Sequence, residues 1–302
     1  MRAGMKVAGA VAGALALAVG CSVVKGTAGV ANKMGVITKD QAGAMSDAAD
    51  AVRASWHEFT DSEEFYIGRS VAANVLATYK TVDGDALNDY VTRVGTAVAL
   101  ASDRPQTYGG YHFQVLDTDE VNAFAAPGGF IFVTKGTLGL CESEDMLACV
   151  LAHEVEHVVK KHGLQAISGS RVREAFKALG KAGATLVMTP EQLASASKAL
   201  AGSVGDISDA MLKNGYGKGP EKEADTGAVV YAARTGYDPN AMAYFLDAMQ
   251  RHEGVAKGGT FATHPKPAER IAIVKEKIAD DKLVPGSPAT GRVDRFKAAV
   301  GA

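Results

Sequence analysis

Apolar side chains recur at helical spacing along most of this chain. This periodicity, together with helix-start and helix-stop signals, predicts helices in several stretches. They cover residues 47–59, 62–79, 85–101, 220–235, 240–253 and 267–280. The second is expected to begin at Ser62, which can cap a helix and is followed by two acidic residues.

Two short segments have the pattern of strands instead. Residues 111–116 alternate as Tyr-His-Phe-Gln-Val-Leu, residues 130–133 form the apolar run Phe-Ile-Phe-Val, and Pro127-Gly128-Gly129 marks a turn between them. Residues 164–212 are alanine-rich with helical stretches, and the chain after residue 283 has no strong pattern. We therefore expect an α+β fold that is mainly helical, with a small β-sheet.

The strongest helical pattern covers residues 143–161. Ser143 is a good N-cap, two acidic residues follow it, and Lys160 and Lys161 suit the negative end of a helix. Most of the positions between them are apolar, which predicts a buried helix. Charged groups inside such a helix need a partner or a metal.

The first twenty residues are not expected to belong to the fold. Arg2 and Lys6 precede an apolar run that is shorter than the roughly 20 residues needed to cross a bilayer, as in a secretory signal. The sequence Ala-Val-Gly-Cys then ends at Cys21, so the segment resembles a bacterial lipoprotein signal that is cut before a lipidated cysteine. The alternative is a plain signal peptide with an incidental cysteine. Ser22 resembles an outer-membrane sorting signal.

These patterns suggest four parts. They are a signal peptide at 1–20, a tether at 21–45, a main domain at 46–282 and a C-terminal tail at 283–302. Composition agrees with a globular body, since 47% of the 302 residues are hydrophobic. The formal net charge of −2 gives no electrostatic footprint for nucleic acid.

Cysteine usage excludes a thiolate metal cluster. Three cysteines cannot form a disulfide framework or a four-thiolate site. Cys141 and Cys149 are eight positions apart around the start of the buried helix, about 12 Å if both are helical. We expect two separate thiols with no role in metal binding.

The buried helix carries His153-Glu154-Val155-Glu156-His157, an HExxH motif. Two histidines four residues apart differ by about 40° around a helix, so both can reach one metal ion. Glu154 borders the same face and can take a proton from a water activated by the metal. Imidazole and carboxylate ligands with an open position favour catalytic zinc, one ion per chain.

The third ligand must come from elsewhere in the chain. The metzincin pattern fails, because Gly163 stands where its third histidine would be, and helical geometry points His162 toward solvent. Two glutamates compete in Glu-Lys-Glu-Ala-Asp. Glu221 shares a stripe with the small residues 224 and 228, whereas Glu223 lies about 160° away, so Glu221 is favoured.

Asp225 follows Glu221 by one helical turn. It is placed to accept the remaining N–H of a ligating histidine and to fix its tautomer. Alternatively, both acids only complement the positive end of the helix.

Several motifs together resemble one family of HExxH zinc metallopeptidases, that of the CAAX prenyl proteases and the HtpX-type heat-shock proteases, and its soluble secreted branch in particular. These motifs are HEVEH at 153–157, EKEAD at 221–225, the segment 122–129, the active-site helix at 143–162, and His-Pro at 264–265 followed by Arg270. The resemblance spans about residues 60–280 and implies a gluzincin-like domain with an HExxH active-site helix. Membrane spans of the prenyl protease branch are not evident after the signal, so prenylated substrates are not expected.

The resemblance also suggests roles for residues away from the motif. Asn122 and Ala123 would pair with extended substrate backbone, or Asn122 would form a turn with Phe124 in the core. His264 or Arg270 would stabilise the oxyanion, and His264 could instead occupy the open zinc position as a gate. The alternatives are a helix boundary at His264 and a structural ion pair for Arg270.

The sequence therefore predicts a zinc metalloendopeptidase with Glu154 as proton acceptor. The resemblance suggests protein quality control in the bacterial cell envelope, with unfolded or misassembled envelope proteins as substrates. The lipid on Cys21 would place the protein at the membrane, on the periplasmic face of the outer membrane. The competing prediction is a non-catalytic or latent lipoprotein chaperone or assembly factor that binds extended chains in the same cleft.

Overall fold

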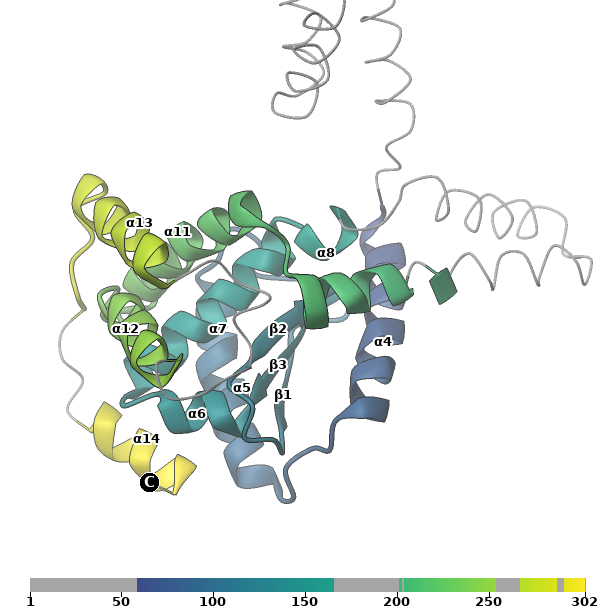
Figure 1. Ribbon diagram of the computed structural model, residues 1–302, viewed down its shortest axis with the longest axis horizontal. Helices are drawn as coiled ribbons and strands as arrows, with labels where there is room; N and C mark the ends of the chain where they lie inside the picture. The colour runs from purple at the N-terminus through teal and green to yellow at the C-terminus, as the bar shows by residue number, and fades with distance from the viewer. Residues whose placement is uncertain (1–58, 166–200, 203, 254–266, 287–290, 302) are drawn as a thin grey trace, which may run out of the picture. The chain divides into compact units, whose positions relative to one another are not determined.

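A three-stranded mixed sheet lies at the centre of the fold (Figure 1). Strand β3 (Phe130–Thr134) is the middle strand. It pairs in parallel with β1 (His112–Leu116) and antiparallel with β2 (Ala123–Ala126). The computed structural model describes residues 59–165, 201–202, 204–253, 267–286 and 291–301. They belong to one compact unit, Phe59–Ala302.

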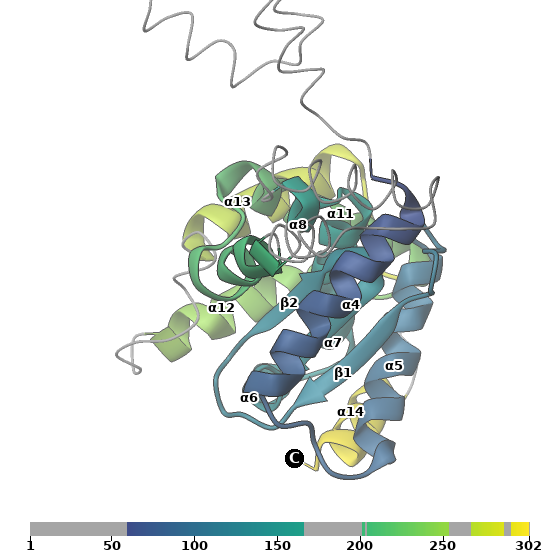
Figure 2. The same ribbon diagram turned by 90° about the vertical axis from the view of Figure 1, so that its right-hand side faces the viewer.

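The two faces of the sheet are covered by different helices. Ile131 and Val133 point toward α5 (Asp85–Leu100) and α7 (Glu144–Val159) and join the larger core. Phe124 and Phe132 point the other way, toward α4 (Asp61–Thr78), which crosses the sheet in Figure 2. The apolar alternation along each strand thus separates two cores.

The remaining helices surround α7. Helix α11 (Lys218–Thr235) packs along it, α12 (Ala241–Glu253) packs against both, and α13 (Pro267–Asp280) packs against α11 and α12. The other elements, in chain order, are η1 (Pro127–Gly129), α6 (Lys135–Leu140), α8 (His162–Gln165), η2 (Ala210–Asn214) and α14 (Arg292–Val300). Within the ranges described, no helix is both long and apolar enough to span a membrane.

Most predicted elements are confirmed within about two residues. Ser143 caps α7 by accepting from the N–H of Met146, and Gly236 ends α11 with a positive φ of 85°. The cap of α4 is a correction, because Thr60 rather than Ser62 forms a capping box with Glu63. The predicted helix at 47–59 falls in the part that is not described apart from its last residue, as do the signal, the tether, and most of 164–212.

Helix α14 corrects the expectation of a patternless tail after residue 283. Phe296 is buried, and Arg295 pairs with Glu144 at the start of α7 through a 2.7 Å contact. Glu144 also accepts hydrogen bonds from the hydroxyls of Tyr90 and Tyr237. Phe296 packs into the larger core with Ala299 and Val300 beside it, so α14 is held by both apolar and polar contacts.

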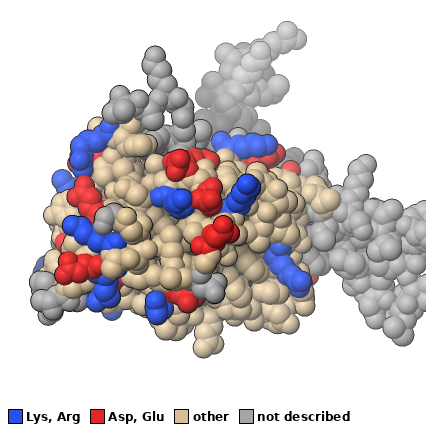
Figure 3. All heavy atoms as spheres, turned by 90° about the horizontal axis from the view of Figure 1, so that it is seen from below, with Lys and Arg blue, Asp and Glu red and all other residues tan. Residues whose placement is uncertain are grey.

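Strand β2 and helix α6 were also missed by the sequence patterns. The four residues of β2 read Ala-Phe-Ala-Ala, which carries little intrinsic strand preference, and the strand forms because β3 lies beside it. Cys141 and Cys149 are buried free thiols, and burial raises the pKa of each. On the face shown in Figure 3, acidic and basic side chains are intermixed, in keeping with the small net charge.

Candidate metal centre and cleft

Two helices bring together three side chains of the kinds that bind metal ions. His153 and His157 come from α7 and Glu221 from α11, and one ligand atom of each lies within 4.8 Å of the others. All three side chains are almost fully buried. The structure thus unites the three residues that the sequence favoured as ligands.

Small residues on α11 allow this approach. Ala224 and Ala228 are fully buried against α7, as their position on the stripe of Glu221 predicted. At Gly227 an added Cβ would lie 2.4 Å from the carboxyl carbon of Glu156. A larger side chain there would have to displace the side chain of Glu156.

Two carboxylates flank the imidazole of His153. Its Nδ1 lies 3.0 Å from Oδ1 of Asp225, and its Nε2 lies 3.5 Å from Oε2 of Glu221. Burial disfavours the charged imidazole, yet the hydrogen bonds to these carboxylates outweigh burial and raise the pKa of His153 to about 9. The site therefore favours positive charge at the place where a divalent cation would bind.

Asp225 is held from the other side by Arg270 of α13. The guanidinium donates to both carboxylate oxygens, at 2.9 and 2.7 Å. Burial opposes ionisation of Asp225, but Arg270 and His153 outweigh it and lower its pKa. Of the two predicted roles for Arg270, the ion pair is present. Arg270 also lies at the cleft, with Nη2 3.4 Å from Nδ1 of His153.

His162 corrects the expectation that it faces solvent. It is 2% exposed, and its Nδ1 lies 2.9 Å from Nδ1 of His157. Helix α7 ends at Val159, and Lys161 adopts a positive φ of 56°, so the helical projection does not extend to residue 162. The residue with the positive φ is a lysine rather than a glycine, so its residue type does not mark the break. Glu223 is 57% exposed and contacts His162 at 3.4 Å, outside the ligand set.

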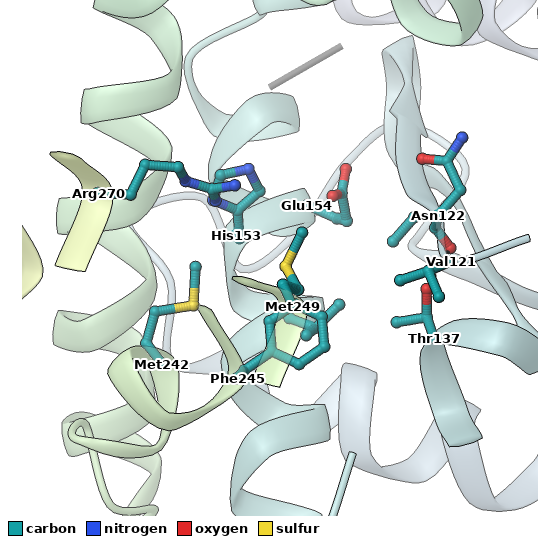
Figure 4. A pocket seen from close by; sticks show the side chains of 11 residues that line it. Val121, Asn122, Thr137, His153, Glu154, Met242, Phe245, Met249 and Arg270 are labelled. Carbon is teal, nitrogen blue, oxygen red and sulfur yellow. Dashed lines mark hydrogen bonds between the residues drawn. The ribbon is translucent and has the colours of Figure 1, made fainter. Parts of the chain in front are cut away.

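A small pocket opens beside the three candidate metal ligands (Figure 4). Glu154 lies at its centre, with Asn122 on one side and His153 and Arg270 on the other. Met242, Phe245 and Met249 of α12 form its apolar wall. Sequence reasoning missed this wall, because an apolar stripe lining a cleft looks like one facing the core.

Asn122 leads into β2 and does not form a turn. Its backbone N–H donates to the hydroxyl of Thr134, its side-chain nitrogen donates to Glu120, and Phe124 is buried in the core as expected. Within the described residues the side-chain oxygen of Asn122 has no hydrogen-bond partner. His264, the other residue expected near the cleft, lies outside the described residues.

The donors suit zinc. Two imidazole nitrogens and one carboxylate oxygen match catalytic zinc sites, which keep a further position open for water or substrate. Their convergence beside Glu154 defines the class of HExxH metallopeptidases. The chain belongs to Peptidase family M48, whose family model matches residues 85–278. The CAAX prenyl protease and HtpX-type resemblance is to this same family, and its metalloproteases use zinc.

Comparison with known proteins finds several relatives. The beta-barrel assembly-enhancing protease of Escherichia coli K12 is 25% identical over 240 residues, which are 78% of this chain and 48% of the relative. Mitochondrial metalloendopeptidase OMA1 of Schizosaccharomyces pombe is 33% identical over 200 residues, or 64% and 54% of the two chains. Metalloprotease YcaL of E. coli K12 is 24% identical over 175 residues, or 57% and 63%. The chain spans about half the length of the first two.

Proposed function

We propose that this protein is a zinc metalloendopeptidase that cleaves unfolded or misassembled proteins of the bacterial cell envelope. The observation that carries the proposal is the buried set of His153, His157 and Glu221 beside an open pocket that contains Glu154. The relatives named metalloprotease or metalloendopeptidase support the activity. Those named beta-barrel assembly-enhancing protease support substrates in the envelope.

Different residues of the chain have different roles in the proposed peptide hydrolysis. Bound zinc would supply Lewis-acid polarisation of the scissile carbonyl and of the attacking water. Glu154 takes the proton from that water and passes it to the leaving amine. Asp225 holds the Nδ1–H of His153, so that Nε2 is directed at the metal, and Arg270 fixes Asp225 in turn.

Substrate would lie in extended form between β2 and the pocket. Asn122 and Ala123 border the cleft and would align the peptide backbone, while Met242, Phe245 and Met249 would receive one side chain next to the scissile bond. The side chains of this wall are apolar, and the nearby guanidinium of Arg270 is bound by Asp225. We therefore expect apolar substrate residues at this position. We also propose that Arg270 or His264 stabilises the oxyanion, or that His264 occupies the open zinc position as a gate.

Removal of zinc tests the activity. We expect one zinc ion per chain, cleavage of an unfolded envelope protein by the zinc-loaded chain, and loss of cleavage after chelation with recovery on adding zinc. Mapping the cut sites by mass spectrometry should show an apolar residue flanking the cleaved bonds. Binding of unfolded protein without any cleavage, at full zinc occupancy, would favour the chaperone alternative instead.

We also propose a lipid anchor at Cys21, after removal of residues 1–20, with residues 21–45 as a tether on the periplasmic face of the outer membrane. The support is the signal-like sequence before Cys21. Mass spectrometry of the protein from a bacterial host should find an N-terminal acylated cysteine. An uncut, unmodified Cys21 would contradict the anchor and leave the proposed peptidase activity unaffected.

A further inference from the structure

One edge of β2 is turned toward the cleft. The carbonyl of Asn122 accepts from the N–H of Thr134, and the antiparallel register pairs Phe124 with Phe132. Because backbone groups in an antiparallel pair alternate in direction, Ala123 and Ala125 direct their N–H and C=O groups away from β3. Ala123 also lines the pocket. An extended substrate would meet these outward groups.

The hydroxyl of Tyr216 already occupies one of these positions. It donates a hydrogen bond to the carbonyl of Ala125 at 3.1 Å. The ring packs against His157, with centroids 4.8 Å apart, and lies 6.1 Å from the ring of His162. Tyr216 therefore connects the ligand helix α7 to the outer edge of β2.

The glycines on either side of Tyr216 set the position of this residue. Gly215 and Gly217 on either side have φ values of 69° and 90°, a conformation that other residues rarely adopt. The preceding turn, η2, contacts β2, and α11 begins at Lys218, directly after the second glycine. The position of the tyrosine is thus fixed by the same turn that starts the helix carrying Glu221.

We propose that Tyr216 determines how far an extended substrate can pair with β2. Outward backbone groups of a strand repeat every two residues, so a substrate paired with Ala123 would next reach Ala125, about 7 Å along the strand. The carbonyl of Ala125 already accepts a hydrogen bond from the hydroxyl of Tyr216. Substrate residues beyond the one paired with Ala123 then add little to the binding affinity on this side of the scissile bond. This inference rests on the proposed function, because it assumes a peptide in the cleft.

A length series of peptides tests this role. Binding is measured by fluorescence anisotropy on the zinc-loaded Glu154→Gln variant, which holds the peptide without cutting it. Unstructured peptides are extended two residues at a time toward the Ala125 side. With Tyr216 present, we expect affinity to stop rising after the first pair. With Tyr216→Leu added, which removes the hydroxyl and the outer part of the ring, the longer peptides should bind about two- to tenfold more tightly, the effect of one backbone hydrogen bond.

Two controls keep the result specific. Tyr244 is an exposed tyrosine on α12, and Tyr244→Leu should leave the length dependence unchanged. Zinc content should be the same in all variants, which shows that the metal ligands are still in place. An equal change in affinity at every length, or no change, would overturn the proposal. Absence of cleavage by the parent chain would refute the peptidase activity, and the binding series would still decide the role of Tyr216.

Discussion

Replacing Glu154 by glutamine should lower the kcat for peptide cleavage by roughly 10²–10⁴-fold, the usual contribution of a positioned general base. Glutamine has nearly the same shape but cannot accept a proton from the attacking water. Zinc affinity should stay unchanged, because the grouped metal-ligating residues are His153, His157 and Glu221. Steady-state kinetics on an unstructured peptide, together with zinc titration, measures both quantities.

Glu156 provides a matched control within the same motif. It is also buried, but its carboxylate points toward α11, where it accepts a hydrogen bond from Tyr231 and lies 3.7 Å from Lys160. The amide oxygen of Glu156→Gln can still accept from Tyr231, so kcat should change by no more than a few-fold. If both variants lost activity equally, the loss would reflect damage to α7 and the assignment of Glu154 would be wrong.

Replacing Glu221 by glutamine should weaken zinc binding by about 100-fold or more. The loss of an outer hydrogen-bonding partner of a metal ligand already costs about 10–100-fold, and Glu221 is proposed to bind the metal directly. Competition with a chromogenic zinc chelator measures the dissociation constant without relying on activity. Zinc should also raise the melting temperature of the variant less than that of the parent protein at equal concentration.

Glu223→Gln is the corresponding control, two residues away on the same helix. Glu223 is largely exposed and contacts His162 rather than the ligand set, so its replacement should alter zinc affinity only slightly. The sequence left these two glutamates in competition, and the pair of variants decides between them. Strong loss of zinc in Glu223→Gln with an intact Glu221→Gln would reverse the ligand assignment.

The centre of the site was predictable because its geometry is local. The spacing of His153 and His157 places both on one face of a helix, and the small residues on the stripe of Glu221 indicate which glutamate faces α7. Both inferences need only the regular geometry of a single helix. Asp225 followed from the same argument, one turn further along α11.

Features that depend on breaks in regular structure were not predictable in this way. His162 is buried because Lys161 leaves the helical conformation, and no residue type announces that change. Strand β2 is selected by its neighbour β3 rather than by its own sequence. The contact between Tyr216 and Ala125 joins residues 91 positions apart through one hydroxyl, which leaves no periodic pattern.

The contacts of α13 and α14 have a consequence for the order in which the protein can become active. All three proposed metal ligands precede residue 222, but Arg270, which fixes Asp225, and Arg292 and Arg295, which hold the first turn of α7 through Asp145 and Glu144, come much later. During synthesis the N-terminal part of the chain is made first. The three proposed ligands are therefore present before the arginines that fix the residues around them. Under the proposed function, this delay would keep an incomplete chain from cutting unfolded copies of itself.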